Sequence, residues 1–262
     1  MYTDTHCHLA LMDGSPDELA ARARAVGVTT LVTVGVDLAS SAECVQTAVS
    51  TPGVYATVGI HPNNAIEATE HVLPKIATLA AHPKVVAIGE TGLDWFRDHC
   101  PRVRQEESFR EHIRIAKDLD KALVIHMRDA HDDALRVLSE ERAPRRTVFH
   151  CFSGDIDFVK LCSEQGWYMS FAGNLTFANA GSLRAAAAVA PLDLLVVETD
   201  SPYLSPHPYR GKPNEPGRVV LIVAQLAALH DMTAEEMARV TSMNAQRLFA
   251  FPVEGEAHLP EK

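Results

Sequence analysis

Residues 85–90 read VVAIGE, a short apolar run rich in small and β-branched residues that ends in a carboxylate. The same pattern recurs in ALVIH at residues 122–126, in TVFH at 147–150 and in LLVVETD at 194–200. Short apolar runs of this kind are typical of strands that are buried on both faces of a parallel sheet. Each run therefore predicts a strand that ends in a side chain able to bind a metal ion.

Similar runs alternate with helical patterns along the whole chain. We expect strands at residues 3–6, 29–34, 55–59, 85–89, 123–126, 147–150, 167–171 and 194–198. Helical patterns lie between them, for example at residues 15–25, 104–119 and 129–140. Eight alternations favour parallel strands with right-handed crossovers, and in 262 residues the natural closure is a (β/α)8 TIM barrel of the α/β class.

An open, doubly wound sheet is the structural alternative. Such a sheet usually carries a Gly-rich phosphate turn after its first strand, whereas His-Cys-His stands there in this chain. The sequence contains no low-complexity linker or internal repeat that would mark a domain boundary. We therefore expect one TIM-barrel domain over residues 1–251 and a polar tail over residues 252–262.

The composition is that of an ordinary globular protein. The net charge is −10 and the sequence pI about 5.7, so the composition does not indicate a broad basic surface for binding nucleic acid. Five cysteines without a CxxC pair argue against a disulfide framework or a zinc ribbon. The N-terminus lacks the features of a signal peptide, and the longest apolar stretch, Val219–Leu229, is too short to span a bilayer. We expect a cytoplasmic protein with no membrane association and no obligate protein partner.

The ends of the expected strands carry candidate metal ligands. His6 and His8 flank Cys7, and alternate side chains of a strand share a face, so both imidazoles should point inward. In a TIM barrel the carboxyl ends of the strands form one rim, where active sites are built. Six side chains should converge at this rim: His6, His8, Glu90, His126, His150 and Asp200.

These six side chains predict a centre of two divalent metal ions. Buried imidazoles and carboxylates are costly unless they are paired or bound to a metal. Four imidazoles and two carboxylates can serve two ions if one carboxylate bridges them. The nitrogen-rich set suits Zn, Mn, Co or Ni as well as Mg, and the sequence does not choose among them. Two such ions can hold a hydroxide between them, which predicts a metal-dependent hydrolase.

The motifs around these ligands resemble those of a known family. They are, in chain order, TDTHCHL, VGIHP, GETGLD, VIHMRDA, FHCFSG, GNLTF, ETDSPYL and RGKPNEP, followed by NAQRLF. From residue 1 to about 250, the chain resembles the TatD family of metal-dependent deoxyribonucleases, within the amidohydrolase-like barrels. The resemblance implies that one metal is held by His6, His8, Glu90 and Asp200, and the other by Glu90, His126 and His150. It also implies exonucleolytic hydrolysis of phosphodiester bonds in DNA.

In the hypothesis that follows, a hydroxide bridging the two metals attacks phosphorus in line, and Glu90 and Asp200 are the catalytic residues. Glu90 bridges the metals, and Asp200 accepts or relays a proton. One alternative is hydrolysis of another ester or amide at the same site, since some relatives act on D-aminoacyl-tRNA. A non-catalytic barrel that serves as an interaction protein is disfavoured, because all six ligands are present.

Two residues near the strand ends are candidates for binding the substrate. Arg128 should share the direction of His126 and can grip a phosphate by two parallel hydrogen bonds. Its alternative role is a salt bridge to Asp129 or Asp132. His61 ends the third expected strand and is either a substrate contact or a turn histidine.

Further candidates lie on the loops. Ser153 and Gly154 should open the helix after the sixth strand, which makes Ser153 either a phosphate contact or an N-cap. The loop RGKPNEP carries Arg210, Lys212 and Asn214 and is the best basic patch for a nucleic-acid backbone. An ordinary solvated loop is the alternative.

Two carboxylates are candidates for supporting the ligands. Asp94 can accept a hydrogen bond from a ligand histidine and so orient it, or it can form an Asx turn. Glu198 should face inward below the metals, where a buried carboxylate needs a partner. Arg128 and His126 are the candidates for that partner.

Three other positions bear on the substrate. Trp95 and Phe96 could stack on a base, although aromatic residues more often belong to the core. Ala178 departs from the family, whose members commonly carry Lys or Arg there. This departure predicts weaker DNA binding or a preference for another substrate.

Overall fold

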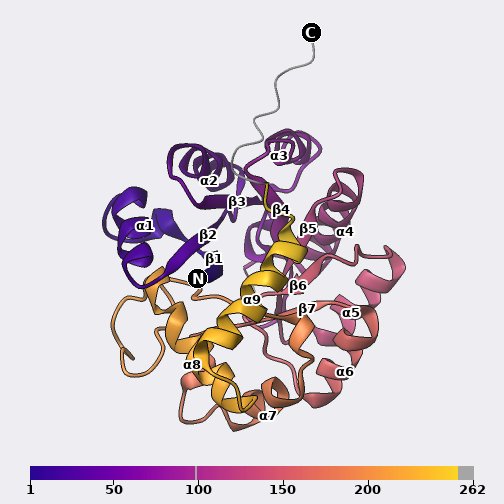
Figure 1. The fold of residues 1–262 in the computed structure, drawn as a ribbon. Helices are drawn as coiled ribbons and strands as arrows, with labels where there is room; N and C mark the ends of the chain where they lie inside the picture. Colours follow the sequence, from indigo (N-terminus) through magenta and orange to yellow (C-terminus); the bar gives the residue numbers. More distant parts are fainter. Residues whose placement is uncertain (98, 253–262) are drawn as a thin grey trace.

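Eight parallel strands follow one another around the sheet in chain order (Figure 1). The computed structural model describes residues 1–97 and 99–252. The strands are β1 (Tyr2–Cys7), β2 (Val28–Val34), β3 (Val54–Val58), β4 (Val85–Asp94), β5 (Ala122–Arg128), β6 (Thr147–Phe149), β7 (Tyr168–Phe171) and β8 (Leu195–Val197). A parallel bridge between Cys7 and Ser201 joins the two ends of the sheet. The predicted (β/α)8 TIM barrel is confirmed.

The closure between β1 and the segment after β8 is made by backbone hydrogen bonds. Asp200 N donates to His6 O at 2.9 Å, and His8 N donates to Ser201 O at 2.8 Å. The contacts lie beyond the last residue of β8, so the first and last strands meet at their carboxyl ends. Three predicted ligands are therefore fixed against one another by the main chain itself.

Helices α1 to α8 form an outer layer around the barrel, and α9 lies across one end of it (Figure 1). They are α1 (Pro16–Ala25), α2 (Leu38–Ser50), α3 (Leu73–Ala80), α4 (Arg102–Asp118), α5 (His131–Glu140), α6 (Ile156–Gln165), α7 (Gly181–Val189), α8 (Val219–Leu229) and α9 (Ala234–Phe249). Over the described residues, no single helix is long and apolar enough to cross a membrane. The segments Pro216–Leu229 and Ala234–Phe249 meet that test only together, and they bend by 108° at their junction.

Local capping explains where several helices begin. Ser15 accepts a hydrogen bond from Glu18 N, and Glu18 accepts one from Ser15 N, so α1 starts with a capping box. Helix α6 starts later than expected: its N-cap is Asp155, which accepts from Phe158 N. The expectation that Ser153 opens this helix is therefore wrong, because the aspartate supplies the stronger cap nearer the helix.

Strand side chains alternate between two apolar layers. Those facing outward, such as Ile125 and Phe149, pack against the helices. Those facing inward near the amino ends of the strands include Val124 and Val148, and they pack in one cluster with Phe249 of α9. Helix α9 thus covers the amino end of the barrel (Figure 1), and the carboxyl end is left for a site.

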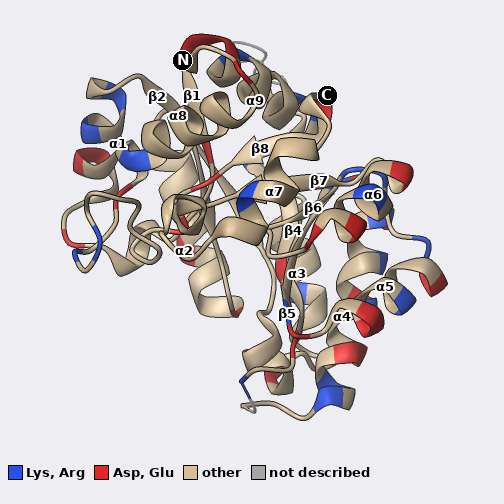
Figure 2. Cartoon of the chain, turned by 90° about the horizontal axis from the view of Figure 1, so that it is seen from below, with Lys and Arg blue, Asp and Glu red and all other residues tan. Residues whose placement is uncertain are grey.

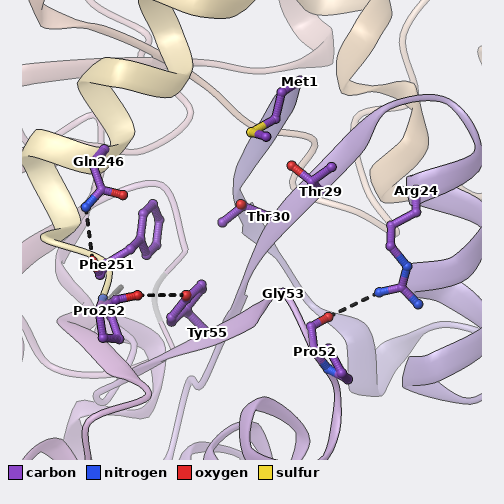
Figure 3. Close-up of a pocket in the computed structure, with 10 residues that line it drawn as sticks. All are labelled: Met1, Arg24, Thr29, Thr30, Pro52, Gly53, Tyr55, Gln246, Phe251 and Pro252. Atoms are coloured by element: carbon purple, nitrogen blue, oxygen red, sulfur yellow. Dashed lines mark hydrogen bonds between the residues drawn. The ribbon is translucent and has the colours of Figure 1, made fainter. Parts of the chain in front are cut away.

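A hollow of about 720 Å³ lies beside α9 at the amino end (Figure 3). Its lining includes Tyr55, Arg24 and Gln246, all of which have polar partners: Tyr55 donates to Pro252 O, and Arg24 to Pro52 O. The lining contains no cluster of metal-binding side chains among the residues described. Among the described residues, such clusters lie at the carboxyl end of the barrel instead.

Opposite charges are interspersed on the outer helices, for example on α4 and α5 (Figure 2). Arg110 of α4 pairs with Glu106 at 2.8 Å and with Glu141 at 2.8 Å. The excess of acidic residues therefore does not form a single-sign face over these helices.

The boundaries of the expected domain stay a prediction. All described elements from β1 to α9 belong to the barrel or its helical layer. Of the expected tail at residues 252–262, residues 253–262 lie outside the described part of the chain.

Asn244 ties α9 to the barrel and supplies a test of this fold. Its buried amide donates to Leu192 O at 2.7 Å and to Leu195 O at 2.8 Å. Asn244→Ala leaves these carbonyls without that partner, so the free energy of unfolding should fall by about 1–3 kcal/mol in urea denaturation. Met243→Ala, at a side chain that is 55% exposed on the same helix, is the control and should change it by at most ~0.5 kcal/mol. Equal effects of the two substitutions would contradict this role.

Candidate metal centre

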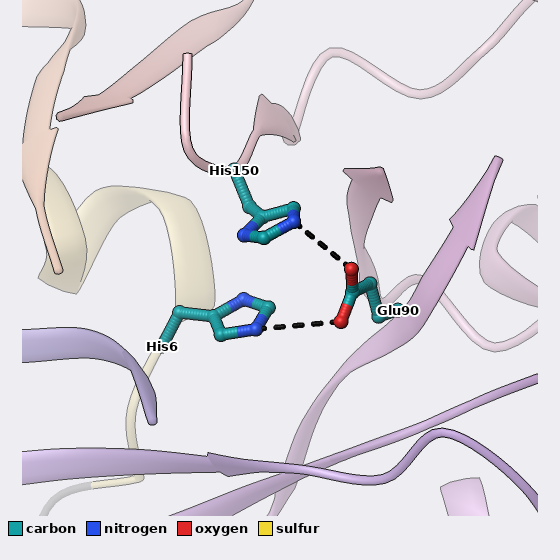
Figure 4. A group of neighbouring side chains, drawn as sticks. All are labelled: His6, Glu90 and His150. Carbon is teal, nitrogen blue, oxygen red and sulfur yellow. Dashed lines mark ion pairs between the residues drawn. The ribbon is translucent and has the colours of Figure 1, made fainter. Parts of the chain in front are cut away.

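The six predicted ligands come together at the carboxyl end of the barrel. Figure 4 shows His6, Glu90 and His150, which reach the same point from three different strand ends. Three groups of side chains have ligand atoms within 4.8 Å of one another: His6, Glu90 and His150; His6, His8 and Asp200; and His61, Glu90 and His126. The groups overlap, so they form one centre.

Glu90 lies between two sets of imidazoles. Its Oε1 is 2.8 Å from His126 Nδ1 and 2.9 Å from His150 Nε2. Its Oε2 is 3.4 Å from His6 Nε2. One oxygen of this carboxylate therefore faces His126 and His150, and the other faces His6.

Asp200 completes the set on the β1 side. Its Oδ1 is 3.7 Å from His6 Nε2 and 3.5 Å from His8 Nε2. The two histidines share the inward face of β1, as their spacing predicts. His6 of β1, His8 just after that strand and a carboxylate from the loop after β8 thus meet across the closure of the barrel.

Two glycines let β4 bring Glu90 into this position. A Cβ atom at Gly89 would lie 2.5 Å from Val124 O, and one at Gly92 would lie 2.1 Å from His126 O. Both glycines have positive φ, of 141° and 134°. The register between β4 and β5 shifts between Ile88 and Thr91, and pairing then resumes from Thr91 to Asp94. Strand β4 therefore extends to Asp94, whereas the sequence predicted its end at residue 89.

Three of the candidate ligand histidines are held from behind by hydrogen-bond acceptors. His8 Nδ1 donates to Val34 O at 3.2 Å, which leaves the lone pair on Nε2. In the same way His126 Nε2 contacts Asp94 Oδ2 at 3.3 Å. Acceptors in this position fix the tautomer and the ring orientation of a metal ligand.

The third acceptor is Glu198, which contacts His150 Nδ1 at 3.1 Å and accepts from Cys151 N at 2.8 Å. The expectation that Arg128 or His126 pairs with Glu198 is therefore wrong. Arg128 lies two residues beyond its strand's ligand, toward the rim, whereas Glu198 lies two residues before Asp200. The two side chains belong to different layers of the barrel.

The donor set fits divalent metal ions. With the rear nitrogens of His126 and His150 donating, the lone pairs of their front nitrogens face Glu90 Oε1 within 2.9 Å. Two electron-rich atoms at this distance need a cation or a proton between them. His6 is 1% exposed, and neither of its ring nitrogens has a hydrogen-bond partner among the residues described. Imidazole nitrogens with carboxylate oxygens are ligands of Zn, Mn, Co and Ni, and the carboxylates also suit Mg.

In the metal-free protein, the carboxylates favour protons on the ligand imidazoles. Burial opposes the charged form of His150, but Glu90 and Glu198 outweigh it and raise the pKa of His150 well above its usual value. Burial also opposes the charged form of His126, and the carboxylates of Asp94 and Glu90 again outweigh it and raise the pKa. Metal ions must displace these protons to bind.

His61 lies at the centre but presents a different group to it. Its Nδ1 accepts a hydrogen bond from Asn63 N at 3.0 Å, so a neutral ring carries its proton on Nε2. This Nε2 lies 3.5 Å from Glu90 Oε1. Burial lowers the pKa of His61 to about 4, so the ring is neutral at pH 7. His61 therefore offers an N–H donor, and it also begins the turn Pro62–Glu67, so both expected roles are compatible with its position.

Arg128 faces the rim beside Phe96. Its guanidinium lies 3.7 Å from the centroid of the Phe96 ring. No ion pair joins it to Asp129 or Asp132, and all three residues are described by the structure. Its charge is thus not neutralised by either of the expected partners.

The loop candidates are placed differently from one another. Ser153 and Lys212 are exposed, and Arg210 stacks on Phe177 with 3.6 Å between the guanidinium carbon and the ring centroid. Asn214 is only 3% exposed and donates to Thr199 O at 2.9 Å, so its amide holds the loop after β8.

Two guanidinium groups lie close to Ala178. Arg184 donates to Ala178 O at 3.3 Å, and Arg210 stacks on the neighbouring Phe177. The expectation of weaker DNA binding stays a prediction.

Asp94 has both of its expected roles. Besides contacting His126, it accepts hydrogen bonds from Phe96 N and Arg97 N, each at 2.9 Å, in an Asx turn. Trp95, which follows it, donates to Asp133 at 3.0 Å and is half-buried, whereas Phe96 is 60% exposed.

The sequence reasoning missed three supporting residues. Asp4 is fully buried and accepts from Thr199 Oγ1 at 2.6 Å, which holds the segment before Asp200. Asn63 donates to Asp94 at 3.3 Å, and His112 accepts from Ile60 N at 3.0 Å, next to His61. Asp4 could have been found, because it stands two residues before His6 in a strand that is otherwise buried.

The fold and the site together define a metal-dependent hydrolase of the TIM-barrel type. The model of the TatD related DNase family matches residues 3–250. The chain belongs to this family.

Relatives and solved structures agree with this assignment. The chain is 41% identical to an uncharacterized metal-dependent hydrolase, YabD, of Bacillus subtilis, over 95% of this chain and 99% of that protein. It is 36% identical to a protein of Musicola paradisiaca named 3'-5' ssDNA/RNA exonuclease TatD, over 92% and 94% of the two chains. The crystal structure of YJJV, a TatD homologue from Escherichia coli, superposes with a TM-score of 0.89 at 30% identity, covering 96% of this chain and 98% of that one.

Removing the acceptor behind His150 should weaken metal binding. Glu198→Gln keeps the shape of the side chain but removes the charge that supports the His150 ring. Changes of such supporting groups typically cost 10–100-fold in metal affinity, and we expect about 10-fold by isothermal titration calorimetry. Glu164→Gln, at an exposed position of α6, is the matched control and should bind as the wild type does. Unchanged affinity in Glu198→Gln would show that this contact does not support the ligand.

Metal binding should also release protons. Because the pKa values of His126 and His150 are raised in the metal-free protein, these rings are protonated more often near neutral pH than an ordinary histidine. Metal affinity should therefore rise with pH as those protons are lost. Calorimetry at pH 7 in buffers of different ionisation enthalpy measures the protons released per metal, and a value of zero would contradict this coupling.

Proposed function

We propose that this protein is a divalent-metal-dependent nuclease that hydrolyses phosphodiester bonds of DNA from a strand end. The observation that carries the proposal is the carboxylate of Glu90, with one oxygen facing each of two sets of imidazoles. Two metals bridged by one carboxylate would suit in-line displacement at phosphorus. Membership of the TatD related DNase family and the name of the Musicola paradisiaca relative support the same substrate class.

Two divalent ions would be held at this centre. One would lie between His6, His8, Glu90 and Asp200, and the other between Glu90, His126 and His150. When bound, they would activate water as the nucleophile and neutralise charge on the phosphate.

Asp200 is placed to accept a proton from the attacking water. Burial favours its neutral form, but the His8 and His6 rings outweigh burial and lower the pKa of Asp200 below its usual value. The carboxylate is therefore ionised at neutral pH and able to act as a base. Glu90 shares the same environment, and its pKa is well below the usual value despite burial.

Groups around the metals would bind the phosphate. The Nε2–H of His61 points into the centre and can donate to a phosphate oxygen. Arg128 can donate two parallel hydrogen bonds from the rim. Farther out, Arg210 and Lys212 on the loop after β8 and the exposed Ser153 can contact the backbone of the strand.

Hydrolysis of a different ester, such as the aminoacyl bond of D-aminoacyl-tRNA, would use the same metals. The net charge of −10 and Ala178 favour this second candidate, because both reduce the attraction of a long polyanion. A non-catalytic barrel is not supported, since relatives are named metal-dependent hydrolases. The cytoplasmic location expected from the sequence stays a prediction.

Substitution of Glu90 tests the central carboxylate. Glu90→Ala removes the oxygen atoms that face both sets of imidazoles, so fewer metals should bind and DNA cleavage should fall by at least about 10³-fold, equivalent to several kcal/mol of lost stabilisation. Circular dichroism should show the folded barrel, and metal analysis should show the lost ions. Cleavage near the wild-type rate would overturn the role of Glu90.

The substrate class is tested by parallel assays of the wild type, each with and without chelator. The substrates are single- and double-stranded DNA labelled at the 3' or the 5' end, and D-aminoacylated tRNA. Chelator-sensitive shortening of DNA is expected, whereas deacylation of tRNA without DNA cleavage would favour the second candidate.

A further inference from the structure

Exposed aromatic rings gather at the metal-bearing end of the barrel. Among the described residues, the exposed large aromatic side chains are Phe96, Tyr203 and Tyr209, at 60%, 54% and 39% exposure. Phe96 follows the end of β4, and the two tyrosines lie on the loop after β8. Exposed aliphatic side chains, by contrast, also occur at the opposite end, for example Val49 and Met243.

Phe96 is fixed to the metal centre on the β4 side. Its backbone N donates to Asp94 Oδ1 at 2.9 Å, and the other oxygen of Asp94 contacts the ligand His126. Arg128 lies over the ring, 3.7 Å from its centroid, yet the residue stays mostly exposed. The ring and the guanidinium together make a flat, cationic surface beside the ligands.

Tyr203 is fixed to the metal centre on the other side. Its backbone N donates to Asp200 O at 2.8 Å. Its ring centroid is 6.1 Å from that of the ligand His8, at an angle of 72° between the ring planes. An exposed aromatic residue is therefore tied to a candidate ligand on each side, Phe96 to His126 through Asp94 and Tyr203 directly to His8.

The order of the strands places the two rings on opposite sides of the metals. The sheet runs from β1 to β8 and closes between these two, so the junction of β8 with β1 lies across the barrel from β4 and β5. A strand of nucleic acid laid over the centre would pass from one ring to the other. Flat rings bind unpaired bases by stacking without regard to sequence.

We propose that Phe96 and Tyr203 are base-stacking platforms that hold the nucleotides on the two sides of the phosphodiester bond to be cleaved. This inference rests on the proposed nuclease function. Stacking on these rings means that the protein binds the bases as well as the phosphates. The bases must be unpaired at both platforms. A base-paired end would have to open before it could occupy the site.

Binding of fluorescent oligothymidylate, followed by anisotropy in the presence of chelator to prevent cleavage, tests the platforms. Phe96→Ala and Tyr203→Ala should each weaken binding by roughly 5- to 150-fold, the range for loss of one stacked base. Phe96→Tyr and Tyr203→Phe keep a ring and should restore binding to within about 2-fold. Met243→Ala, on the opposite end of the barrel, is the matched control.

An oligonucleotide of the same length with abasic sites separates stacking from backbone binding. Because it has no bases to stack, its affinity should be weak and should change by less than about 2-fold in the alanine variants. In cleavage assays of oligothymidylate, the alanine variants should raise KM more than they lower kcat. If the alanine variants lost equal affinity for normal and abasic strands, or lost none for either, the two rings would not be stacking platforms. The nuclease function would stand in that case, provided that the wild type still cleaves DNA. A wild type that neither binds nor cleaves any nucleic acid would overturn the proposed function and the platforms together.

Discussion

The carboxylate of Glu90 is buried among imidazoles, and most of what surrounds it keeps this charge compensated. A buried carboxylate without partners is far less stable than one in water. Glu90 is 3% exposed and has ring nitrogens on both of its oxygens. The barrel provides this neighbourhood because its strands all end at one rim, where side chains from distant parts of the chain can meet.

A second layer of carboxylates extends the same compensation outward. Asp94 and Glu198 lie behind His126 and His150 and contact their rings. Asp4 plays a different part: burial raises its pKa to about 8, so it is mostly neutral at pH 7 and holds the segment before Asp200 by hydrogen bonds to Thr199. All three side chains are buried. Charge is therefore balanced in shells, from the central carboxylate to the ligand rings and then to the acceptors behind them.

The sequence was sufficient to predict the barrel and to place the six candidate ligands at one rim. Strand alternation decides which way His6 and His8 point, and parallel strands decide where the ends of β4, β5 and β6 lie. Both rules follow from the pattern of residues along each strand, so a single sequence is enough to apply them. The extension of β4 beyond Glu90 depends on how closely Gly89 approaches Val124 O on the neighbouring strand, which no local pattern contains.

Contacts across the barrel were the least predictable part. The pairing of Glu198 with His150 depends on the height of each side chain along the barrel axis. The burial of Asn214 and the stacking of Arg128 on Phe96 depend on how loops fold back over the rim. Such positions follow from packing between segments far apart in sequence, and propensity or spacing carries little information about them.

The closure of the barrel has a consequence for the order in which the centre assembles. Glu90, His126 and His150 come from β4 to β6 and are all present once the middle of the chain has been synthesised. His6 and His8 are made first, yet their carboxylate partner Asp200 is made last, after β8. One half of the centre is thus encoded in a contiguous block, and the other half joins the two ends of the barrel. Contact of Asp200 with the two histidines therefore requires that the last strand has docked against the first.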